Sequence, residues 1–206
     1  MKYSWAATGF LVLAISTRAN AAEPPQKKLE LSVSGGYSAT DQVLDVTHAI
    51  PIGVSAGYRF TPSWSAGVYG EYGIIHGSFV NPDLDGTRSG SHLRLGIQVR
   101  HQVAPEKIVN PWLGVGIGLD RISYDESDNA GFPTPEHYSF NVRTTGIELL
   151  SAQFGIEFHV VPAFGIGPYV NGTVVDYLTI KPVDDSRDPP GLQMWLTLGA
   201  RATLYL

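Results

Sequence analysis

The residues best suited to chemistry in this sequence lie in two short polar stretches. The first is His137-Tyr138-Ser139, which is followed by a carboxylate at Glu148. A histidine beside a serine can accept the serine proton, and a carboxylate that orients the histidine completes an activated hydroxyl nucleophile. Histidine next to serine in a polar segment also occurs by chance. A catalytic role for His137, Ser139 and Glu148 is therefore a hypothesis that rests on one short motif.

The second stretch places oxygen ligands at alternate positions, Asn81, Asp83 and Asp85, and Gly86 follows them. A calcium loop begins in this way, but its twelfth position holds a bidentate glutamate, and here that position is His92. A solvated acidic turn is the alternative interpretation. The sequence shows neither a phosphate-binding glycine loop nor zinc-ligand spacing. We expect no metal and no other cofactor.

The N-terminal segment has the pattern of an export signal. Lys2 precedes an apolar run over residues 5–15, and Ala19-Asn20-Ala21 matches an A-x-A cleavage site. The alternative is a membrane anchor, but the run is shorter than the roughly 18 residues that a spanning helix needs. We expect residues 1–21 to be a cleaved signal peptide and residues 22–206 to form one mature domain.

The charge balance and the absence of cysteine exclude several classes of protein. The net charge of −5 would become −7 once Lys2 and Arg18 leave with the signal peptide. An acidic mature chain argues against nucleic acid as a partner. Without cysteine, neither disulfides nor thiolate metal sites can form. Stability must come from the packing and hydrogen bonding of the domain itself.

Alternation of apolar with small or polar residues is the main structural signal. No uninterrupted apolar run after residue 22 is long enough for a spanning helix, whereas alternating segments of membrane-strand length recur eight times. The eight segments cover or begin at 29–39, 52–60, 64–74, 92–100, 111–120, 150–159, 164–167 and 195–206.

The links between these segments alternate in length. The links at 61–63, 102–110 and 161–163 are short, and those near 41–49, 76–91, 123–146 and 177–191 are longer. Short turns on one side and long loops on the other are typical of outer-membrane barrels. The pattern predicts an all-β fold, an eight-stranded antiparallel up-and-down transmembrane β-barrel. A secreted sandwich or lipocalin-like barrel is the alternative, but it would not leave the glycine-rich, charged face inside.

Three stretches, PWLGVGIGLD, GPYVNG and LTLGARATLYL, resemble the small outer-membrane barrels of OmpA and OmpX type. The resemblance covers the mature chain and implies a Gram-negative outer-membrane location, with membrane lipid, lipopolysaccharide and the barrel-assembly machinery as partners, and a monomer. One departure is Leu206 after Tyr205, where such barrels usually end in phenylalanine. The His-x-Ser motif separately resembles lipid A deacylase barrels, which would make Glu148 the orienting acid.

The two faces of the predicted strands have different expected roles. Five aromatic residues lie near strand ends beside the two proline turns and would form a girdle at a membrane interface: Tyr58, Phe60, Trp64, Phe158 and Phe164. Eight charged residues fall on the inward face: Glu30, Arg59, Glu71, Arg94, Arg100, Asp120, Glu157 and Arg201.

Eight strands enclose a space that side chains can fill, so bulky inward residues must lie over small ones. We expect the rings of Tyr69, Tyr169 and Trp195 to lie over Gly114, Gly116 and Gly118. Glu71 and Arg94 fall at similar heights on adjacent strands and are the first expected ion pair.

Three functions follow from these patterns. The first is a non-enzymatic envelope protein whose long acidic loops contact partners or surfaces. The second is a narrow gated pore for ions or small solutes, and the third is a lipid A-modifying hydrolase.

Overall fold

The computed structural model describes residues 28–40, 48–78, 87–127, 139–181 and 191–206. No helix long and apolar enough to cross a membrane occurs among these residues. The predicted signal peptide, residues 1–21, lies outside them. Eight strands are described: β1 (Leu29–Thr40), β2 (His48–Arg59), β3 (Trp64–Ser78), β4 (Thr87–Gln102), β5 (Val109–Ser127), β6 (Ser139–Val161), β7 (Phe164–Lys181) and β8 (Gly191–Tyr205).

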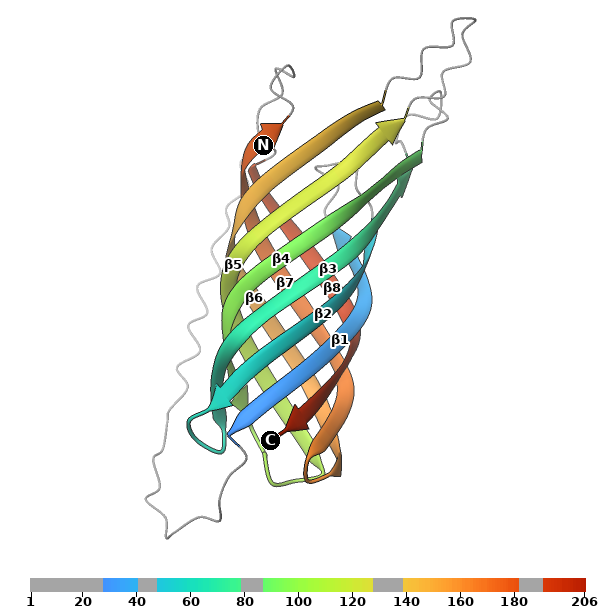
Figure 1. The fold of residues 1–206 in the computed structure, drawn as a ribbon. Helices are drawn as coiled ribbons and strands as arrows, with labels where there is room; N and C mark the ends of the chain where they lie inside the picture. Colours follow the sequence, from blue (N-terminus) through green and yellow to red (C-terminus); the bar gives the residue numbers. More distant parts are fainter. Residues whose placement is uncertain (1–27, 41–47, 79–86, 128–138, 182–190) are drawn as a thin grey trace, which may run out of the picture.

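The strands form one closed sheet (Figure 1). Each strand pairs antiparallel with its neighbours in the chain, and β1 pairs with β8 in a register that places Glu30 opposite Tyr205. Beside this pair, the backbone groups of Leu29 and Leu206 exchange hydrogen bonds of 3.2 and 2.9 Å. Closure leaves none of the eight described strands as an edge with unpaired backbone groups. The prediction of an eight-stranded antiparallel barrel is confirmed.

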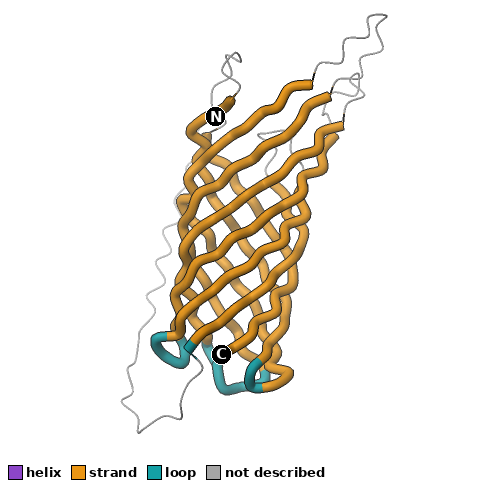
Figure 2. Tube along the Cα trace, in the orientation of Figure 1, coloured by secondary structure: helices purple, strands orange, loops and turns teal. Residues whose placement is uncertain are grey.

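The short links gather at one end of the barrel. They span residues 60–63, 103–108 and 162–163, and Figure 2 shows them at the same end as the last residue of the chain. We call this the short-link end. The segments 41–47, 79–86, 128–138 and 182–190 join strands at the opposite end and lie outside the described residues.

At the opposite end the strands are longer than the sequence pattern predicted. β5 continues to Ser127 and β6 begins at Ser139, so much of the expected loop 123–146 is strand. The expected loops 76–91 and 177–191 are shortened in the same way. The ladder continues because backbone hydrogen bonds do not depend on side-chain polarity. Alternation disappears where both faces of a strand are polar, and the prediction therefore ended the strands too early.

The outer wall of the barrel is apolar. Val54 and Leu119 are each 60% exposed although both belong to regular strands, and Glu30 and Asp120 on the inward face are at most 2% exposed. The arrangement reverses that of a water-soluble protein, in which strands bury their apolar face. The wall is suited to an apolar surrounding.

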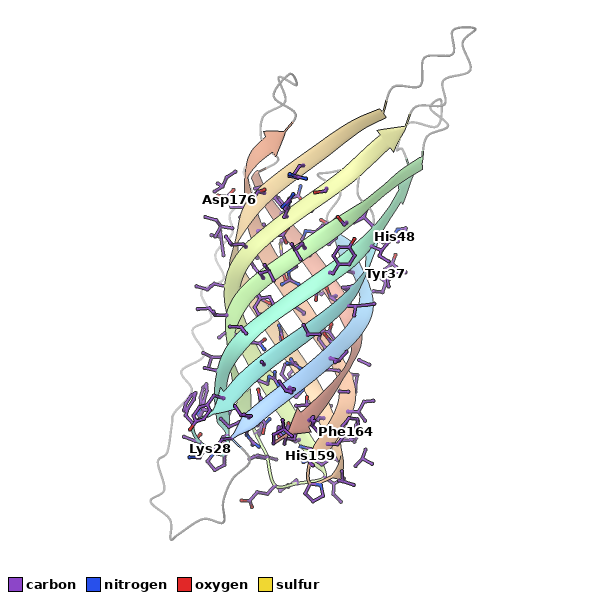
Figure 3. The ribbon with its side chains drawn as sticks, in the orientation of Figure 1. Lys28, Tyr37, His48, His159, Phe164 and Asp176 are labelled. Carbon is purple, nitrogen blue, oxygen red and sulfur yellow. The ribbon has the colours of Figure 1, made fainter. Side chains whose placement is uncertain are left out.

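The five predicted girdle residues lie around the short-link end. Tyr58, Phe60 and Phe158 are 44–56% exposed, and Trp64 stacks on His101 with ring centroids 4.5 Å apart. Figure 3 shows Phe164 near this end, whereas the stacked rings of Tyr37 and His48 lie further towards the opposite end.

A β-bulge in β6 resets the alternation. Glu148 pairs with Val175 and Leu150 with Val174, so Leu149 is the extra residue. Leu149 and Leu150 are both about half exposed, and Glu148 is fully buried. Alternation counted back from Leu150 places Glu148 on the outer wall, which is why it was not predicted among the inward charges.

Glycines set how closely the strands approach, and Gly167 on the inward face can be compared with Gly172 on the outer wall of the same strand. A Cβ at Gly167 would overlap the carbonyl oxygen of Ile156, whereas a Cβ at Gly172 would meet no atom within 4 Å.

We expect Gly167→Ala to lower the free energy of unfolding by about 3 kcal/mol or to prevent folding, because overpacking forces the backbone apart. Gly172→Ala should stay within about 0.5 kcal/mol of the parent chain. Urea titrations of the two refolded variants make the comparison, and equal midpoints would contradict this account.

Candidate functional site inside the barrel

Arg94 is the centre of the largest charge cluster. The cross-strand register places it directly opposite Glu71 of β3 and Asp120 of β5. Its Nη1 lies 2.9 Å from a Glu71 carboxylate oxygen, its Nη2 lies 2.9 Å from Glu148, and its Nε lies 3.9 Å from Asp120. Nη2 also donates to the Thr173 hydroxyl at 2.9 Å. Side chains from the two adjacent strands, β3 and β5, and from two strands across the lumen, β6 and β7, thus contact the guanidinium of Arg94. Arg94 is only 2% exposed.

Tyr69 closes the lumen beside this cluster. Its hydroxyl donates to Glu148 at 2.5 Å, and the Arg94 guanidinium lies 5.8 Å from its ring centroid. The ring occupies the space that side chains at Gly96, Gly116 and Gly118 would need. Of the glycines expected beneath Tyr69, the structure places Gly116 and Gly118 there.

The expectation that Tyr169 and Trp195 lie over the β5 glycines was wrong. Tyr169 lies against Gly199, within 2.9 Å of where a Cβ would be, and it does not lie over the β5 glycines. Trp195 stacks on a histidine, as described below. The ring that covers Gly155 and approaches Gly114 is Trp112, which belongs to β5 itself. Alternation gave the face of each ring, but the register between neighbouring strands decided which glycine it covers, because Tyr169 lies directly opposite Gly199 and Trp112 directly opposite Gly155.

Towards the opposite end, a second polar group surrounds Asp120. His92 Nε2 lies 2.7 Å from one carboxylate oxygen, and the Tyr177 hydroxyl donates to the other at 2.8 Å. Trp195 Nε1 donates to Tyr177 at 3.3 Å, and its ring stacks on His92 with centroids 4.5 Å apart. Each oxygen of the Asp120 carboxylate thus has a hydrogen-bond partner inside the barrel.

Beyond this group lies an apolar cap that the sequence analysis did not predict. It consists of Ala49, Ile75, Ile122 and Val175, each with no exposed surface. Ile75 follows Ile74, so two successive apolar residues in a strand were the available signal that one of them points inward. The cap and Trp195 fill the lumen at this level.

A third group occupies the short-link end. Glu30 accepts from the Ser65 hydroxyl at 2.8 Å and lies 3.5 Å from Arg100 Nη1. Glu157 accepts from the Tyr205 hydroxyl and lies 2.8 Å from His159 Nε2.

Two of the predicted inward arginines have neutral partners. Arg59 donates to the Gln102 side chain at 2.7 Å and to the Pro62 carbonyl oxygen at 2.5 Å. Arg201 donates to Ser55 at 2.6 Å and more weakly to Gln153 at 3.4 Å. The structure therefore places all eight predicted charges inside the barrel and brings Glu71 to Arg94 and Glu30 to Arg100.

The two chemical motifs lie largely outside the part of the chain that the structure describes. His137, Asn81, Asp83 and Asp85 lie outside the described residues. Glu148 lies in the lumen, and Ser139 starts β6 nine residues away, on the order of 30 Å at about 3.3 Å per residue. Among the described residues no group of three or more histidine or acidic side chains could hold a metal ion.

A polar cavity of about 30 Å³ lies between the Arg94 and Arg201 groups. Its lining includes Ser55, Gln98, Gln153, Tyr169 and Asn171, together with Glu71 and the two arginines. A cavity needs about 10–15 Å³ of such volume for each water, so this one has room for about two.

A closed eight-stranded antiparallel barrel with an apolar wall and a filled, polar interior is the architecture of small outer-membrane barrels. No protein-family model matches the chain, and no curated protein matches its sequence. Among solved structures, Neisserial surface protein A is similar with a TM-score of 0.55 and 15% identity, over 86% of this chain and 96% of that one. This likeness shows that the chain has the fold of the small eight-stranded outer-membrane barrels.

Two further solved structures are similar over most of their length. The outer membrane protein AlkL, determined in lipid bilayers, has 15% identity and a TM-score of 0.48 over 94% of this chain and 98% of that one. OprG from Pseudomonas aeruginosa has 12% identity and a TM-score of 0.47 over 88% and 98%.

Removing Arg94 alone is expected to destabilise the barrel strongly. Arg94→Met would leave Glu71 and Glu148 buried without their cation, and removing one partner of a buried pair costs about 3–5 kcal/mol. Arg121→Met, on the outer wall opposite Leu93, is the matched control and should cost less than about 1 kcal/mol. Urea unfolding of both refolded variants tests this. Adding Glu71→Gln and Glu148→Gln to Arg94→Met should recover part of the loss, and an Arg94→Met chain as stable as the parent would remove Arg94 from this role.

Proposed function

We propose that the chain is an integral, non-enzymatic protein of the bacterial outer membrane that acts through its outer end and its wall, as an envelope or surface-contact protein. The observation that carries the proposal is the filled lumen. Arg94, Trp195, Ile75 and Glu148 occupy successive levels of the interior and are each at most 2% exposed. Side chains that line a water-filled channel would be in contact with solvent. A lumen without a solvent path leaves the wall and the two ends to carry function.

The outer wall supports the membrane location. Its apolar side chains are largely exposed, and the closed ladder satisfies the backbone groups that hydrocarbon cannot. The aromatic girdle at the short-link end matches the position of an interface. In this orientation the short-link end faces the periplasm, and the assembly machinery, membrane lipid and lipopolysaccharide are the expected partners of a monomer.

The composition of the linking segments at the opposite end supports a contact role. Segments 41–47, 79–86, 128–138 and 182–190 together contain nine acidic residues and one arginine. Residues joined to a rigid barrel at this end would present an acidic surface to the outside. Such a surface suits basic partners or partners bridged by cations.

Membrane location is tested by fractionation of expressing cells. We expect the chain, cleaved near residue 21, in the outer-membrane fraction and with a gel mobility that changes on heating. A chain recovered in the periplasm would refute the proposal, because its apolar wall would then be covered by something other than lipid.

The closed lumen is tested by ion conductance of the refolded chain in a planar bilayer, after its β content and heat-modifiable mobility are verified. We expect no discrete conductance steps, because both the apolar cap and the Arg94 cluster block the axis of the barrel.

A narrow gated pore is the alternative function, and the polar cavity between two arginines favours it. Steps that are lost or altered in Arg94→Met or Glu71→Gln but kept in Arg121→Met would establish the pore.

A further inference from the structure

The cavity in the lumen contains a buried cation without an anionic partner. Arg201 is 7% exposed and lines the cavity, and its Nε has no hydrogen-bond partner. Its two other nitrogens donate to the neutral groups of Ser55 and Gln153. Among the described residues no carboxylate lies at ion-pair distance from it, whereas Arg94 has three and Arg100 has one. Removing an unpaired charge from water is costly, so such a group normally has a counter-ion.

The acids near Arg201 are engaged elsewhere. Glu71 lines the same cavity, but its carboxylate lies 2.9 Å from Arg94. Glu30 interacts with Ser65 and Arg100, and Glu157 with Tyr205 and His159. Of the two guanidinium groups on the cavity wall, that of Arg94 is offset by Glu71, Glu148 and Asp120, and only that of Arg201 has no carboxylate at ion-pair distance among the described residues.

The neutral groups of the wall add hydrogen-bond donors. Because the Ser55 hydroxyl oxygen and the Gln153 carbonyl oxygen accept from Arg201, the Ser55 proton and the Gln153 amide nitrogen are free to donate. Gln98 and Tyr169 also line the space. The cavity of about 30 Å³ has room for about two waters, so it suits a small anion such as a halide.

We propose that this cavity is a binding site for one small monovalent anion of the halide class, with Arg201 as its cation and Ser55 and Gln153 as hydrogen-bond donors. The anion would be the counter-ion of Arg201, the cavity guanidinium that no carboxylate of the described residues reaches. The proposal is independent of where the barrel resides and of what its outer end contacts.

The experiment is an unfolding titration of the refolded chain at constant ionic strength, in which chloride replaces gluconate, an anion too large for the cavity. Ligand that binds only the folded state raises the folded-to-unfolded ratio in proportion to its concentration above Kd. For the parent chain we expect a rise that approaches tenfold for each tenfold increase in chloride. Arg201→Met should show no rise, and Arg121→Met, the matched control on the outer wall, should keep the slope of the parent.

Diffraction provides a second, direct measurement that does not require the variant to fold. Crystals of the parent chain grown in bromide should show an anomalous peak in the cavity beside Arg201. A parent chain without chloride dependence, a dependence that persists in Arg201→Met, or a cavity that contains water alone would each overturn the proposal.

Discussion

The hydrogen-bond ladder between β1 and β8 is the constraint on which the rest of the structure depends. By closing the sheet it satisfies the backbone of every described strand within the sheet itself, and the outer wall is thereby free to be apolar. Closure with eight strands also fixes the width of the interior, which is only wide enough for side chains. Glycines such as Gly96 and Gly155 exist because Tyr69 and Trp112 must fit over them.

Within that fixed width, the interior is sealed by two different kinds of contact. The apolar cap excludes water by packing, and the Arg94 cluster fills its level with a cation whose neighbours are three acids, Glu71, Glu148 and Asp120. Buried charges contribute little net stability when paired and cost much when unpaired. We therefore expect the cluster to specify one arrangement of β3, β4, β5 and β6 more than it stabilises the barrel. Arg201 lies in the same interior and differs from Arg94, because no carboxylate of the described residues lies at ion-pair distance from it.

Alternation in the sequence predicted the number of strands, the closure and the inward face of all eight named charges, because a period of two leaves only one choice of face. It paired Glu71 with Arg94 because the two residues fall at similar heights on strands that follow one another in the chain. It missed Glu148, since a bulge adds one residue that alternation cannot count, and it missed Ile75, which is apolar yet points inward. Contacts across the lumen, such as that of Tyr69 with Glu148, depend on barrel shear, which no single strand encodes.

The pairing of Glu30 with Tyr205 joins the first described strand to the last, and this has a consequence for how the barrel is made. Every other strand pair is local in the chain, but the closing pair is the most distant contact possible, so it forms at the highest cost in chain entropy. Until it forms, β1 and β8 are open edges that can pair with other chains. The slow step of assembly is therefore expected at this seam, and the partly built sheet is the species most in need of a template or a chaperone.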